Sequence, residues 1–97
     1  MKQIELFYLT YCPYCINARK AVGELKDECP AYRPIRIRWI EETEEAELAA
    51  SRDYYYVPTL FCGGEKLYEA RPGHDYARIK ENIRRAFETV LAAPEEA

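Results

Sequence analysis

The chain has 97 residues, of which 48% are hydrophobic and 32% are charged, and its formal net charge is −3. This length suits one domain with a single core, and the composition excludes a disordered chain, which needs few apolar residues and a large net charge. A slightly acidic balance gives no reason to expect nucleic acid or a membrane surface as a partner, since both attract basic patches. We therefore expect one domain over residues 1–97.

The first half of the chain predicts a strand, a helix and a second strand. Residues 4–9 are nearly continuously apolar, which is typical of a strand buried on both faces. Residues 13–26 carry apolar side chains at helical spacing, with Pro13 in the first turn, where a helix accepts proline. Residues 35–40 alternate apolar side chains with arginines, which indicates a half-exposed strand at a sheet edge.

The second half predicts a short helix, a hairpin and a long helix. An acidic stretch over 43–51 fits a short helix with a face of small side chains, supplied by Ala46, Ala49 and Ala50. Residues 59–62 and 66–70 flank the turn at 63–65, whose two glycines are typical of a hairpin. Residues 75–92 repeat apolar side chains at the spacing of one helix face.

The expected element order is therefore β-α-β-α-β-β-α. Two strands joined through a helix pair in parallel by a right-handed crossover, whereas the closing hairpin adds an antiparallel strand. We predict an α/β fold with a mixed four-stranded sheet and helices on both faces.

Cys12 and Cys15 lie between the first predicted strand and the first predicted helix. A helix N-terminus presents unpaired N–H groups and the positive end of the helix dipole, and both favour a thiolate at Cys12. Cys15 follows one turn later, close enough to attack a mixed disulfide on Cys12 and release a reduced substrate. We predict that this dithiol performs thiol–disulfide exchange.

The alternative interpretation of the cysteines is part of a zinc site. A structural zinc ion usually takes four Cys or His ligands, and the other candidates are Cys29, Cys62 and His74. None of these repeats the Cys-x-x-Cys spacing, so we expect no metal. Four cysteines without a signal-peptide pattern, since Glu5 interrupts the first apolar run, indicate a cytoplasmic protein in a compartment that keeps thiols reduced.

Two segments resemble a known family. Phe7-Tyr8-Leu9-Thr10-Tyr11-Cys12-Pro13-Tyr14-Cys15 resembles the active-site segment of dithiol glutaredoxins. Tyr56-Val57-Pro58-Thr59, followed by Gly63-Gly64, resembles their second signature, and the element order is similar to the thioredoxin fold over essentially the whole chain. The resemblance implies a thiol–disulfide oxidoreductase that reduces protein disulfides or glutathione mixed disulfides, with glutathione as co-substrate and no tightly bound cofactor.

The resemblance also implies how substrate is held. It makes the Val57–Pro58 bond cis, packs Pro58 beside the cysteines, and leaves the Val57 backbone free to pair with an extended substrate. Tyr11, Pro13 and Tyr14, which flank or lie within the cysteine motif, are expected to contact substrate.

The family typically binds the two carboxylates of glutathione through a cation before the motif and a turn at the last helix. Here the cation position is Leu9, and the turn is Gly73-His74-Asp75. Backbone N–H groups of that turn would bind a carboxylate and Asp75 would bind the glutathione amine, whereas the simpler role of Asp75 is a helix cap and that of His74 an exposed turn residue.

These departures from the family pattern keep two other functions open. The first is a glutaredoxin-like electron donor that thioredoxin reductase reduces and that serves an enzyme such as ribonucleotide reductase. The second is an iron–sulfur cluster carrier, against which Pro13 argues, because cluster-binding members usually have Gly or Ser there. The expected partners are disulfide-containing or glutathionylated proteins, and we expect a monomer.

Overall fold

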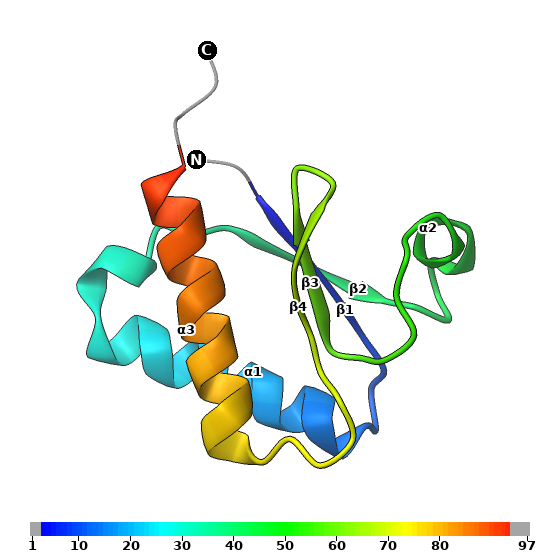
Figure 1. The fold of residues 1–97 in the computed structure, drawn as a ribbon, viewed down its shortest axis with the longest axis horizontal. Helices are drawn as coiled ribbons and strands as arrows, with labels where there is room; N and C mark the ends of the chain where they lie inside the picture. The colour runs from blue at the N-terminus through cyan, green and yellow to red at the C-terminus, as the bar shows by residue number, and fades with distance from the viewer. Residues whose placement is uncertain (1–2, 94–97) are drawn as a thin grey trace.

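The computed structural model describes residues 3–93 and contains a four-stranded sheet (Figure 1). The strand order is β2-β1-β3-β4, and the strands are β1 (Ile4–Tyr8), β2 (Ile37–Glu41), β3 (Thr59–Cys62) and β4 (Glu65–Glu69). β1 pairs with β2 in parallel and with β3 antiparallel, and β3 and β4 form the antiparallel hairpin. The mixed sheet is confirmed, with β2 at an edge.

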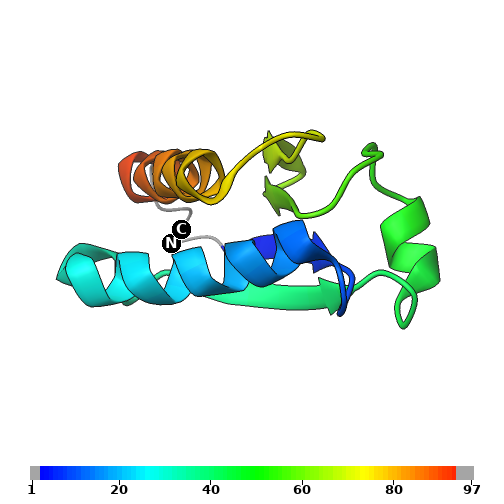
Figure 2. The same ribbon diagram turned by 90° about the horizontal axis from the view of Figure 1, so that it is seen from below.

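Three helices cover the two faces of this sheet. α1 (Pro13–Glu28) and α3 (Tyr76–Ala92) pack together over one face, and the short α2 (Ala46–Ala50) stands apart from them (Figure 2). The larger core includes buried residues of α1, α3, β1, β3 and β4. The smaller core joins Phe7, Ile40 and Phe61 to Leu48 and Ala49 of α2. Helices on both faces are therefore confirmed, and the fold is thioredoxin-like.

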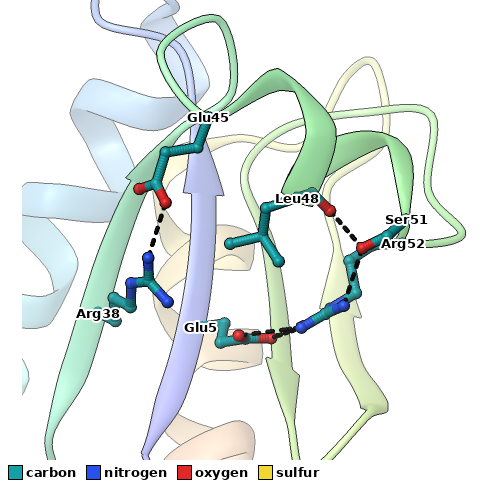
Figure 3. A network of polar contacts seen from close by, with 6 residues as sticks. All are labelled: Glu5, Arg38, Glu45, Leu48, Ser51 and Arg52. Carbon is teal, nitrogen blue, oxygen red and sulfur yellow. Dashed lines mark hydrogen bonds and ion pairs between the residues drawn. The ribbon is translucent and has the colours of Figure 1, made fainter.

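β1 is buried on both faces, as its sequence predicts. Ile4 and Leu6 enter the larger core, whereas Phe7 enters the smaller one. Glu5 shares the Phe7 side of the strand and requires a partner there, because an unpaired charge so close to a core is unfavourable. Arg52, which follows α2, donates to both carboxylate oxygens of Glu5, at 2.8 and 3.0 Å from one nitrogen (Figure 3).

The Glu5–Arg52 ion pair holds the end of α2 against the sheet. The Arg52 guanidinium also donates to the Ser51 hydroxyl at 3.0 Å, and that hydroxyl donates to the Leu48 carbonyl at 2.6 Å (Figure 3). The start of α2 has a second ion pair, between Arg38 and Glu45 at 2.7 Å. A five-residue helix is too short to be stable alone, so these contacts and the smaller core define its position.

Two predicted elements begin at least two residues later in the structure than the sequence predicts. The strand predicted at 35–40 begins only at Ile37, because Ile35 is buried behind a 3₁₀ turn (Pro30–Tyr32) and its N–H donates to the Tyr32 carbonyl at 3.1 Å. The helix predicted at 43–51 is shorter, because residues 42–45 form turns. Of the three alanines expected to form a face of small side chains, Ala49 packs on the smaller core beside Leu48, whereas Ala46 and Ala50 are exposed. Within residues 3–93, no helix is both long and apolar enough to cross a membrane.

Candidate active site

Cys12 occupies the N-cap position of α1, immediately after the loop that leaves β1. Its backbone is extended, with φ −77° and ψ 124°, and Pro13 takes the first helical position, as the sequence predicts. The Ile16 N–H donates to the Cys12 carbonyl at 2.9 Å, which fixes the first turn. The Cys12 side chain is half-buried and makes no side-chain capping bond to residues 3–93. The sulfur therefore lies at the positive end of α1.

Cys15 lies one turn further along α1 and is 4% exposed. Its sulfur accepts a hydrogen bond from the Leu9 N–H at 3.5 Å. Burial is the main cause that raises the pKa of the Cys15 thiol to about 12; the Leu9 N–H partly opposes it, and a hydrogen bond to Cys12 adds to it. Cys15 is therefore buried and remains protonated at neutral pH, whereas Cys12 is only half-buried.

An open depression of about 500 Å³ lies beside Cys12. It is lined by Leu9, Thr10, Tyr11, Cys12, Glu41 and Thr43. Tyr11 is 91% exposed, so its ring is available to a bound partner. Sequence reasoning missed Glu41 and Thr43, although parallel pairing of β1 and β2 brings the ends of both strands, and the loops after them, to one edge.

The Val57–Pro58 peptide bond is cis, as the family resemblance implies. Pro58 is buried, and its carbonyl accepts from the Ala70 N–H at 3.0 Å, which ties it to the residue after β4. Val57 is half-buried against the smaller core.

Tyr14 connects the cysteine motif to the turn before α3. Its hydroxyl accepts a hydrogen bond from the Gly73 N–H at 2.9 Å, across 59 positions of sequence. Gly73 has φ +94°, a backbone conformation that residues with a Cβ rarely adopt, so glycine permits this turn. The structure thus brings together Tyr14 and Gly73, two of the residues predicted to contact substrate.

The side chains of His74 and Asp75 are engaged within the chain. The His74 ring stacks on Tyr68 with centroids 5.9 Å apart, and its Nδ1 lies 2.9 Å from the Tyr68 hydroxyl. The His74 N–H donates to the Arg71 carbonyl at 3.1 Å. Asp75 caps α3 by accepting from the Arg78 N–H at 2.9 Å, which is the structural role considered for it from the sequence.

Neither a metal cluster nor a disulfide is formed by the described residues. Between residues 3 and 93, no three His, Cys, Asp or Glu side chains lie close enough to hold a metal ion. All four cysteines are free thiols. The arrangement at Cys12 and Cys15 is that of a reduced dithiol whose outer sulfur is accessible and whose inner sulfur is buried.

Similar proteins agree with this description. A scan against models of known protein families finds no match. Thioredoxin of Methanocaldococcus jannaschii is 29% identical over 70 residues, which are 72% of this chain and 80% of that protein. A variant thioredoxin of Halobacterium salinarum has a TM-score of 0.60 at 22% identity, covering 97% of this chain and 78% of its own. Thioredoxin 1 of Thermosipho africanus has a TM-score of 0.58 at 18% identity, and the match covers 92% of this chain and 98% of its own.

The chain therefore has the thioredoxin-like fold of these solved structures. As an enzyme, it is a thiol–disulfide oxidoreductase.

Proposed function

We propose that the chain reduces disulfide bonds of other proteins, with Cys12 as the nucleophile and Cys15 as the resolving cysteine. The observation that carries this proposal is the contrast between the half-buried Cys12 at the N-cap of α1 and the 4% exposed Cys15 one turn later. A sulfur at a helix N-terminus is a favourable nucleophile, and a buried neighbouring thiol is reached only by a disulfide already attached to the first sulfur.

The reaction proceeds by two exchanges. The Cys12 thiolate attacks one substrate sulfur, the substrate S–S bond breaks, and the other substrate sulfur leaves as a thiolate that takes up a proton. Cys15 then loses its proton and attacks the Cys12 sulfur of the mixed disulfide, which releases the second substrate thiol. The products are a reduced substrate and a Cys12–Cys15 disulfide, so two electrons and two protons have passed to the substrate.

We further propose that a thioredoxin-reductase-type enzyme, rather than glutathione, reduces the Cys12–Cys15 disulfide. Leu9 has no charge for a glutathione carboxylate where the glutaredoxin pattern has a cation. The N–H groups of Gly73 and His74, which would bind the other carboxylate, donate instead to Tyr14 and to the Arg71 carbonyl. These bonds support a site that does not require glutathione, acting on protein disulfides in the cytoplasm.

Glutathione-dependent activity on glutathione mixed disulfides is the second candidate. It is favoured by the Cys12-Pro13-Tyr14-Cys15 motif, which fits the glutaredoxin pattern. On this alternative, glutathione displaces the Tyr14 hydroxyl from the Gly73 N–H.

The test compares two reducing systems on the same protein. One assay couples reduction of a protein disulfide to NADPH and thioredoxin reductase, and the other couples reduction of a glutathionylated peptide to glutathione and glutathione reductase. We expect turnover in the first assay and little in the second. Robust turnover in the second assay alone would contradict the proposed electron donor.

Variants of the cysteines test their roles in the same assays. Cys12→Ser should abolish all turnover. Cys15→Ser should abolish reduction of the protein disulfide and leave the protein trapped on its substrate through Cys12. Cys29→Ser is the matched control, because Cys29 lies at the far end of α1, and it should keep wild-type rates. Equal activity of Cys12→Ser and wild type would refute the mechanism.

A further inference from the structure

The segment between α2 and the cis Val57–Pro58 bond has no regular secondary structure, yet the proposed substrate contact requires a fixed backbone there. Packing of side chains cannot supply this order along its whole length. Tyr55 is 87% exposed and Tyr56 is 43% exposed, so neither ring is anchored in a core. Tyr54 and Val57 pack against the smaller core, so the part of the segment between them depends on backbone hydrogen bonds for its order.

The carboxylate of Glu69 supplies those bonds. One oxygen of Glu69 accepts from the backbone N–H of Tyr55 at 2.7 Å and from that of Tyr56 at 2.8 Å. The other oxygen accepts from the Lys66 ammonium at 2.8 Å, and the Glu69 side chain is only 6% exposed. Hydrogen bonds to a charged acceptor are about twice as strong as neutral ones, so one side chain holds two consecutive peptide groups firmly.

Glu69 lies at the end of β4, so its side chain can bond to the Tyr55–Tyr56 segment outside the hydrogen-bonded ladder of the sheet. Glu69 is the last residue of β4 and pairs with Thr59, the first residue of β3. Its carboxylate therefore bonds to Tyr55 and Tyr56 at the end of the ladder, in the segment that precedes β3. Thr59 also contributes, because its hydroxyl donates to the Tyr56 carbonyl. The Glu69 carboxylate acts through polar contacts, with the Tyr55 and Tyr56 N–H groups and with Lys66, so its truncation removes these three bonds.

We propose that Glu69 is a positioning residue of the substrate site: by holding the Tyr55 and Tyr56 peptides, it sets the backbone of the Val57–Pro58 segment with which a substrate polypeptide pairs. This inference rests on the proposed function and on the contact that the family resemblance implies for Val57, whose backbone would pair with an extended substrate. It predicts that Glu69 affects the binding of polypeptide substrates and leaves the chemistry of the cysteines unchanged.

The experiment measures kcat and KM for wild type and for Glu69→Ala on two substrates. The first is an extended peptide closed by one disulfide, and the second is a small aromatic disulfide that has no peptide backbone. We expect Glu69→Ala to raise KM for the peptide about tenfold with kcat within about twofold, because the loss of a charge-assisted hydrogen bond corresponds to about a factor of ten. Both constants for the small disulfide should stay within about twofold of wild type.

Two further variants define which contact matters. Lys66→Met removes the ion pair but keeps both bonds from Glu69 to the backbone, so its KM should match wild type. Glu69→Gln keeps one oxygen acceptor without the charge, so its KM should lie between those of wild type and Glu69→Ala. Amide hydrogen exchange gives an independent readout: Tyr55 and Tyr56 should exchange faster in Glu69→Ala, whereas the amides of β1 should not change.

An unchanged KM for the peptide in a folded Glu69→Ala protein would overturn the inference. So would an equal loss on both substrates, which would show that Glu69 acts on the cysteines or on the whole fold. Failure of the proposed function is distinguishable from both outcomes, because wild type itself would then show no Cys12-dependent reduction of either disulfide, and the inference would fall with it.

Discussion

The burial of Cys15 should protect its sulfur from alkylating reagents, because only the thiolate reacts. An ordinary thiol with a pKa of about 8.5 is roughly one-quarter ionised at pH 8. Cys15, with its pKa raised to about 12, is ionised to roughly one part in ten thousand at that pH. We therefore expect iodoacetamide to modify Cys15 in the reduced protein at least about a thousandfold more slowly than an ordinary thiol, and Cys12 to react first.

The pH dependence of the Cys15 alkylation rate tests the direction of its pKa shift. Because the folded protein favours the protonated form of Cys15, its alkylation rate should rise about tenfold per pH unit from pH 7 to 10 without reaching a plateau. Trypsin separates the modified cysteines, since Cys12 and Cys15 lie before Arg19, whereas Cys29 and Cys62 lie in later peptides. Fragment ions between positions 12 and 15 then distinguish the two sulfurs.

The Cys12→Ser variant distinguishes the two causes of the raised Cys15 pKa, burial and the neighbouring Cys12 sulfur. Burial is the largest cause of the raised pKa, so Cys15 should stay slow in Cys12→Ser. The reasoning would be refuted if Cys12 and Cys15 reacted at equal rates in wild type, or if the Cys15 rate reached a plateau near pH 9. Fast modification of Cys15 in Cys12→Ser would show that the neighbouring sulfur, and not burial, protects it.

The remaining predictions concern stability in urea unfolding. Gly73→Ala should lower the free energy of unfolding by about 1–2 kcal/mol because of φ +94°, although nothing lies within 4 Å of the added Cβ; its control, Gly23→Ala inside α1, should raise it by about 0.5–1 kcal/mol, and equal signs would contradict the argument. Burial raises the pKa of Glu69, but Lys66 and two N–H groups outweigh it and lower this pKa to about 2. The Glu69 carboxylate therefore contributes stability above about pH 4.5 that is lost as the pH falls towards 2. In Glu69→Gln, the free energy of unfolding should depend less on pH over this range. Arg52→Met breaks a half-buried ion pair and should lose about 1–2 kcal/mol, whereas Arg38→Met breaks an exposed pair and should lose under about 0.5 kcal/mol; similar losses would be evidence against the role of burial.

Much of the fold follows from signals that act over a few residues. Continuous apolar residues in β1 predict burial on both faces, because the sheet has a core on each side. Pro13 predicts the start of α1, and the capping role considered for Asp75 is confirmed at the start of α3. The glutaredoxin resemblance, and not the base rate for proline, indicates the cis bond before Pro58.

Other features depend on contacts between distant parts of the chain. Ile35 has the sequence pattern of a strand residue, but the 3₁₀ turn that buries it delays β2 to Ile37. The bonds from Gly73 to Tyr14 and from Tyr55 to Glu69 span 59 and 14 positions, and no periodicity or motif within either segment indicates them. These bonds shape the site, so the sequence predicts the reacting cysteines better than the surroundings that select their partners.

The N-cap position of α1 shows how the reactive sulfur competes with the stability of its own helix. Ser, Thr, Asp or Asn would accept a hydrogen bond from the first turn, whereas Cys12 makes no such bond to the described residues. Helix α1 is thus about 1 kcal/mol less stable than it would be with a capping residue, and it has a sulfur at its positive end instead. Selection for a more stable protein would therefore favour replacing the nucleophile itself. At Cys12, a substitution that raises stability would abolish turnover.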